Sequence, residues 1–295
     1  MKKTIFTGMA TALITPMTPD GIDYETLGRF IDFQIDNGIN ALVAMGTTGE
    51  NATIEPEDQY EVIRFTVQHT AGRVPVIAGT GTNNTAHVLE NTKRACEAGA
   101  DAVLVVTPYY NKATQNGLIA HFTAVADVST VPVIVYNVPG RTGCNIQPKT
   151  LSVLADHPNI VAIKEASGNM AQFMEMMRLC GDRIAIYSGE DALTAPMMSM
   201  GCKGAISVLS NVVPAKASAM AAAALAGDYQ EAARLQLQML PLVDALFSQV
   251  NPIPAKAAVS AMGFGQDYLR MPLTPMEEPF RSKLFEEMKK LGVSL

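Results

Sequence analysis

The sequence contains eight short runs rich in Val, Ile, Leu and Ala, and their recurrence limits the folds that the chain can adopt. Each run is continuously apolar rather than alternating, which is typical of a strand buried on both faces, as in a parallel sheet. The runs lie at residues 9–15, 40–46, 74–80, 101–107, 131–137, 159–165, 183–189 and 204–210.

Helical patterns separate these runs. Leu27, Phe30 and Ile31, for example, have the i, i+3, i+4 spacing of one helix face. Eight strand–helix alternations predict an α/β fold, a single (β/α)8 TIM barrel over residues 1–225, with a doubly wound open sheet as the alternative. The pattern stays helical over residues 226–295, which predicts a C-terminal α-helical extension that packs on the barrel or on a neighbouring subunit.

Charge and cysteine content narrow the functional classes. The chain has 22 basic and 28 acidic residues, and the basic ones are scattered, which argues against nucleic acid as a partner.

No apolar stretch approaches the about 18 residues of a membrane span. The N-terminal apolar run ends at Pro16 and favours a first strand over a signal peptide. The cysteines lie far apart and the histidines form no ligand pair, so we expect a reduced, metal-free, cytoplasmic protein. Cys144 is expected to be a small buried filler.

Functional residues of a barrel project from the carboxyl ends of its strands and from the loops that follow. Five of the eight runs end in polar motifs that would meet at this mouth. The motifs are GTTGE with Thr47 and Thr48, TPYYN with Tyr109 and Tyr110, YNVPGRTG with Tyr136 and Arg141, IKEASG with Lys164, and SGED at 188–191.

Lys164 ends an otherwise apolar strand, where desolvation would lower its pKa from about 10.4 toward neutrality. A neutral amine is a nucleophile that attacks a ketone to give a protonated Schiff base, an electron sink for carbanion chemistry. The alternative is that Lys164 pairs with Glu165 or extends from the strand end to solvent.

Hydroxyl groups can pass the protons that Schiff-base chemistry requires, and Thr47, Tyr136 and Tyr110 are candidates for such a relay. Alternatively, the Tyr136 hydroxyl reaches solvent, and the threonines cap the following helix. Arg141 offers a planar fork for a substrate carboxylate, unless it forms a surface salt bridge.

These five motifs, in this order along nearly the whole chain, resemble those of the dihydrodipicolinate synthase family of pyruvate-dependent class I aldolases. The resemblance implies that Lys164 forms the Schiff base with pyruvate and that Tyr136 is the general acid/base. It implies that Thr47 and Tyr110 complete the proton relay, with Tyr110 reaching across a tight dimer interface.

The resemblance further implies that Thr48 holds the pyruvate carboxylate, that Arg141 holds the carboxylate of L-aspartate 4-semialdehyde, and that Gly189 and Ile206 line the pocket. The reaction would be the first committed step of diaminopimelate and lysine biosynthesis, without metal or organic cofactor, in a homotetramer built as a dimer of dimers. N-acetylneuraminate lyase and keto-deoxy sugar acid aldolases share the lysine and the tyrosine, but the GRTG segment with Arg141 favours the synthases. A catalytically silent barrel is the alternative of another class.

One departure concerns regulation. Family members that lysine inhibits bind it at a second site near the dimer interface, using a tyrosine, an Asn, an acidic residue and histidines. Tyr109 and Asn83 are present, but His87 occupies the acidic position, and Pro56 and Gln59 stand where histidines are often found. The ammonium of lysine would lack its carboxylate partner, so weak or absent lysine feedback is predicted.

Overall fold

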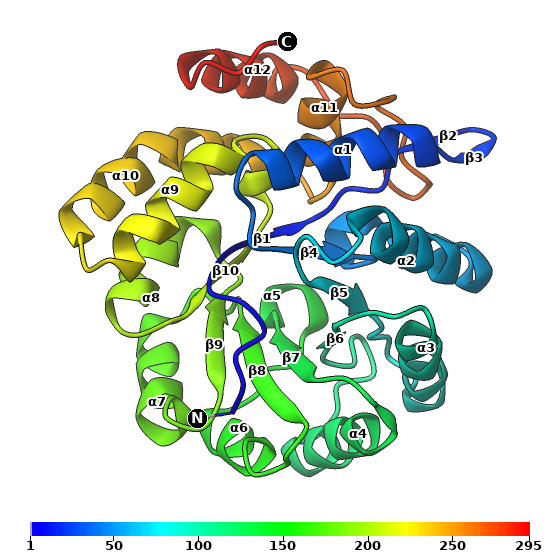
Figure 1. Cartoon of the computed structure of the whole chain (residues 1–295), viewed down its shortest axis with the longest axis vertical. Coiled ribbons are helices and arrows are strands. Elements are labelled where there is room, and N and C mark those ends of the chain that lie inside the picture. Colours follow the sequence, from blue (N-terminus) through cyan, green and yellow to red (C-terminus); the bar gives the residue numbers. More distant parts are fainter. Residues whose placement is uncertain (1) are drawn as a thin grey trace.

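A computed structural model describes residues 2–295 and contains a closed barrel of eight parallel strands surrounded by helices (Figure 1). The strands follow the order β1-β10-β9-β8-β7-β6-β5-β4, and the barrel closes between β1 and β4. All eight strands fall within the eight apolar runs or start one residue before one, which confirms the predicted fold class. The strands are β1 (Gly8–Ala12), β4 (Ala41–Ala44), β5 (Val76–Gly79), β6 (Ala102–Val106), β7 (Val133–Asn137), β8 (Ile160–Glu165), β9 (Ala185–Ser188) and β10 (Gly204–Ser207).

One helix crosses over between each pair of consecutive barrel strands, and an eighth follows β10. These are α1 (Tyr24–Asp36), α2 (Pro56–Thr70), α3 (Thr85–Glu97), α4 (Gln115–Val128), α6 (Pro148–Leu154), α7 (Met170–Cys180), α8 (Thr194–Ser199) and α9 (Pro214–Leu225). Short elements lie in the loops: α5 (Pro139–Thr142) and the 3-10 turns η1 (Thr47–Gly49), η2 (Asp191–Leu193) and η3 (Leu209–Asn211). The hairpin of β2 (Met17–Thr18) and β3 (Gly21–Ile22) was not predicted, because two-residue strands are too short for a periodic pattern.

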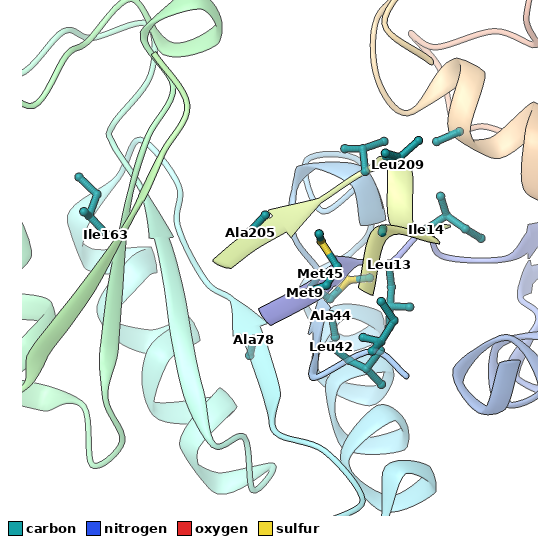
Figure 2. Packing of buried hydrophobic residues seen from close by; sticks show 14 of the residues in the cluster. Met9, Leu13, Ile14, Leu42, Ala44, Met45, Ala78, Ile163, Ala205 and Leu209 are labelled. Atoms are coloured by element: carbon teal, nitrogen blue, oxygen red, sulfur yellow. The ribbon is translucent and has the colours of Figure 1, made fainter. Parts of the chain in front are cut away.

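The apolar core has two layers, because side chains alternate between the two faces of each strand. In β6, Leu104 belongs to the cluster that fills the barrel interior, while Val103 and Val105 pack in the cluster shared with the helices. Figure 2 shows part of this outer layer, where Leu42 and Ala44 lie near Met9. Both faces of the strands are therefore buried, which is why the sequence runs are continuously apolar.

Three helices follow the barrel: α10 (Tyr229–Leu246), α11 (Ile253–Ala261) and α12 (Phe280–Lys290). Helix α10 packs on α9 and α12, and α11 packs on α12 and η3 (Figure 1). We propose the junction between α9 and α10 as the boundary between the barrel, residues 1–225, and the extension, residues 226–295. Within residues 2–295, none of these helices combines the length and the apolar character that crossing a bilayer requires.

Candidate active site

Lys164 and Tyr136 lie side by side at the mouth of the barrel. They are register partners on β8 and β7, and neighbours in register on parallel strands point to the same face, here the barrel interior. The ammonium nitrogen of Lys164 lies 4.5 Å from the centroid of the Tyr136 ring. Lys164 is 5 % exposed and Tyr136 8 % exposed, so the amine and the phenol share one sheltered space.

Burial sets the protonation of both groups. Desolvation lowers the pKa of Lys164 to about 8, with Asp191 opposing the shift and Arg141 adding to it. Desolvation also raises the pKa of Tyr136 to about 12, which keeps its phenol protonated at neutral pH. Glu165 does not pair with Lys164. Its carboxylate accepts hydrogen bonds from the Ser167 N–H, at 2.8 Å, and from the side-chain amide of Asn137, at 2.9 Å.

The two threonines form the turn η1 directly after β4. Thr47 is half-buried and Thr48 is buried, and the Thr48 hydroxyl accepts a hydrogen bond from Asn251 Nδ2 at 3.0 Å. Neither threonine caps helix α2, which begins at Pro56, so the capping alternative is wrong. The hydroxyls are instead held at the mouth of the barrel.

Arg141 lies in α5, after β7, and its side chain crosses the mouth toward the C-terminal extension. Its Nη2 donates to the backbone carbonyl of Asn251 at 2.9 Å rather than to a carboxylate, which argues against the surface salt bridge. Arg141 is exposed to solvent and is also among the residues that line the cavity described next.

A cavity of about 310 Å³ joins these side chains. Six of the eight predicted site residues line it: Lys164, Tyr136, Thr47, Thr48, Arg141 and Gly189. Gly189 is required for steric reasons, because a Cβ there would lie 2.8 Å from Cε of Lys164. The sequence thus keeps space free beside the amine.

The other two predicted residues lie elsewhere. Ile206 is 1 % exposed in the interior of the barrel, opposite Ala10, and is not among the residues that line the cavity. Tyr110 is 89 % exposed, at a backbone φ of +73°, outside the cavity of its own chain.

Sequence reasoning missed Asn251, which contacts both Thr48 and Arg141. No local signal marks this residue, because it lies between two helices of the extension and far from any strand end. It also missed Asp191, whose buried carboxylate accepts hydrogen bonds from the N–H groups of Val208 and Leu209 at 2.9 and 2.8 Å. Asp191 is the last residue of the SGED motif, which could have identified it.

A second, larger cavity of about 720 Å³ lies beside the first and shares Thr47 and Arg141 with it. It gathers the residues that the sequence analysis associated with regulation, from α2, α3 and the loops after β5 and β6. They are Tyr109, Asn83, His87, Pro56 and Gln59.

A closed parallel barrel with a buried lysine and tyrosine at its mouth defines the class: the protein is a lyase of the class I aldolase type. The sequence profile of the Dihydrodipicolinate synthetase family matches residues 5–291, and the chain belongs to that family. Among its relatives, the 4-hydroxy-tetrahydrodipicolinate synthase of Lachnoclostridium phytofermentans is 51 % identical over 291 residues, 98 % of this chain and 99 % of the relative.

Solved structures agree in sequence and in shape. Dihydrodipicolinate synthase from Aquifex aeolicus is 43 % identical with a TM-score of 0.96, over 98 % of this chain and 99 % of that one. The chloride-inhibited enzyme from Acinetobacter baumannii, solved in complex with pyruvate, is 41 % identical with a TM-score of 0.96, over 98 % of this chain and 100 % of that one.

Proposed function

We propose that the protein is a 4-hydroxy-tetrahydrodipicolinate synthase, which condenses pyruvate with L-aspartate 4-semialdehyde through a Schiff base on Lys164. The observation that carries the proposal is the buried amine of Lys164, with its pKa lowered to about 8, beside the protonated phenol of Tyr136. The names of the relatives and the pyruvate bound in the Acinetobacter baumannii enzyme support it.

The first half of the reaction forms the nucleophile. The neutral amine of Lys164 attacks the ketone carbon of pyruvate, and the phenol of Tyr136 protonates the departing hydroxyl, which leaves as water. The hydroxyl and N–H of Thr48 bind the pyruvate carboxylate. Loss of a methyl proton toward the Tyr136 phenolate then gives the enamine.

The second half joins the substrates. The enamine carbon attacks the aldehyde carbon of L-aspartate 4-semialdehyde, whose carboxylate pairs with Arg141, and the new alkoxide takes a proton from Tyr136. The amine of the semialdehyde then attacks the imine carbon, closes the ring and releases Lys164. In this proposal Thr47, which lines the cavity, relays protons between Tyr136 and solvent.

Tyr110 completes the relay from a second subunit in this proposal. Its ring is 89 % exposed in the single chain, and a large aromatic surface of this kind is suited to burial against a partner. We propose a homotetramer built as a dimer of dimers, in which Tyr110 of each subunit enters the mouth of its neighbour.

Reductive trapping tests the chemistry. The protein is incubated with pyruvate and borohydride, digested, and the adduct is located by mass, with and without L-aspartate 4-semialdehyde. We expect an adduct on Lys164 that the semialdehyde suppresses. An adduct that the semialdehyde does not affect would indicate a sugar acid aldolase instead, and the absence of an adduct would refute the mechanism.

A further inference from the structure

A buried ion pair connects the C-terminal extension to the turn that carries the two threonines. Lys256 on α11 and Glu50, directly after η1, have side chains only 2 % and 1 % exposed, and Nζ of Lys256 lies 2.8 Å from Oε1 of Glu50. Burying two charges is costly, and such a pair is maintained only with good geometry and further hydrogen bonds. Neither residue lines the cavity of about 310 Å³, so any role in the reaction is indirect.

Further hydrogen bonds tie the same two residues to two separate segments, and a third bond connects one of these segments back to the loop after η1. Nζ of Lys256 donates to the carbonyl of Thr15, in the loop after β1, at 2.6 Å. The second carboxylate oxygen of Glu50 accepts from the backbone N–H of Arg270 at 3.2 Å. The guanidinium of Arg270 in turn donates to the carbonyl of Thr53, at 3.0 Å. The pair is therefore the centre of a network around one end of η1.

The backbone of η1 needs this support. Glu50 has a φ of +61°, in the left-handed region that is unfavourable for a residue with a side chain. Just before it, the carbonyl of Gly49 accepts a hydrogen bond from the Thr15 hydroxyl at 2.8 Å. The fixed turn presents Thr48 to the cavity, where Asn251 holds its hydroxyl from the other side.

We propose that Glu50 and Lys256 are positioning residues for the carboxylate site at Thr48, so that the extension forms part of the active site. The inference rests on the proposed function, in which the hydroxyl and N–H of Thr48 bind the pyruvate carboxylate. The pair acts on substrate affinity by fixing the turn, and it leaves the amine of Lys164 untouched.

The test is the variant Lys256→Met, which leaves the Glu50 carboxylate without its charge partner. We expect the KM for pyruvate to rise by about tenfold or more while kcat stays within about threefold, because ground-state binding is lost and the chemical groups remain. The pyruvate concentration that gives half-maximal borohydride trapping should rise by the same factor.

Glu287→Gln is the matched control. Glu287 is also buried in the extension and also ion-paired, with Lys283 at 2.6 Å and Lys290 at 3.1 Å, but on α12 and away from η1. We expect it to lower the thermal midpoint and to leave the KM for pyruvate unchanged. The double variant Glu50→Gln/Lys256→Met, which has no unpaired buried charge, should recover thermal stability and keep the raised KM.

The outcomes separate the two proposals. If the wild-type protein traps no pyruvate, the proposed function fails. If the wild type traps pyruvate and Lys256→Met has the wild-type KM, or if the double variant recovers KM together with stability, the positioning role is refuted. If Lys256→Met does not fold, Glu50→Gln replaces it in the test. This variant removes the charge of Glu50 and keeps an oxygen that can accept from the Arg270 N–H. A wild-type KM for pyruvate in Glu50→Gln would then refute the positioning role.

Discussion

The surroundings of Lys164, rather than a neighbouring base, favour the neutral amine that the proposed reaction requires. Burial lowers its pKa to about 8, and the carboxylate of Asp191 opposes that shift by favouring the ammonium. The amine is therefore neutral in a larger fraction of molecules at neutral pH than an exposed lysine is. At a pH of about 8 half of the amine is neutral, and the neutral fraction approaches one only at higher pH.

The rate of Schiff-base formation with pyruvate should rise with pH, with its midpoint at about 8 and a plateau at higher pH. The rate increases with pH because only the deprotonated amine attacks the ketone. In Asp191→Asn the ammonium loses a favourable charge, so the pKa of Lys164 falls further and the profile moves to lower pH. Borohydride trapping rates measured across pH test this, and a profile that moves to higher pH in Asp191→Asn would contradict it.

The residue types of the site could be predicted from the sequence, but the contacts between the site residues could not. Tyr136 and Lys164 lie near the ends of buried strands and Thr47 follows one, and the barrel rule places strand ends together. The contacts of Asn251 with Thr48 and Arg141 join residues that are far apart in the sequence, and no local pattern contains them. Whether Tyr110 belongs to the site depends on a second subunit, which the sequence of one chain does not describe.

At the scale of elements, the segment before β1 is fixed to β9 by an aromatic pair. The rings of Phe6 and Tyr187 stack with centroids 4.3 Å apart, and the Tyr187 hydroxyl donates to the Phe6 carbonyl at 2.7 Å. Both residues are buried in the interior cluster of the barrel. This contact fixes the segment before β1 against the interior cluster.

Tyr187→Phe should lower the free energy of unfolding by about 1–3 kcal/mol, because the buried carbonyl of Phe6 loses its hydrogen-bond donor. Urea denaturation monitored by circular dichroism measures the change. The trapping rate with pyruvate provides the control and should stay at the wild-type value, since Lys164 and Tyr136 keep their positions. An unfolding free energy equal to that of the wild type would refute the structural role.

The strands were easier to predict than the connections between elements. A strand buried on both faces has a strong local signature, and all eight runs contain one. The C-terminal helices were recognised from their periodicity, but their packing on the barrel depends on long-range pairs such as Lys256 with Glu50. Apolar periodicity indicates where a helix lies in the sequence and not which loop it supports.

For the whole molecule, the larger cavity beside the active site contains the residues on which the prediction of weak or absent lysine inhibition rests. His87 lies exposed on α3, where lysine-inhibited family members have a carboxylate, and Glu55 and Glu90 are the acidic residues that line the cavity. A neutral imidazole offers the ammonium of lysine an acceptor without the negative charge of a carboxylate, and a cationic one repels it. The prediction therefore requires that Glu55 and Glu90, which line the cavity elsewhere, do not replace the carboxylate missing at position 87.

Millimolar lysine should therefore inhibit the wild-type protein weakly or not at all. His87→Glu restores an acidic group at this position and should confer inhibition, while His87→Gln, of similar size and without charge, should not. Steady-state rates measured at increasing lysine concentrations, for the wild type and both variants, test this prediction. Micromolar inhibition of the wild type would contradict the prediction, and so would equal behaviour of the two variants.

The dependence of Thr48 on Asn251 and Lys256 also has a consequence for biosynthesis of the protein itself. A ribosome makes all eight strands and the catalytic lysine before it reaches residue 251. A chain that stops after α9 contains the nucleophile but lacks the groups that fix its substrate-binding turn. In the proposed mechanism pyruvate affinity is therefore acquired late in translation, and a chain that terminates early contains Lys164 without the groups that fix the pyruvate-binding turn.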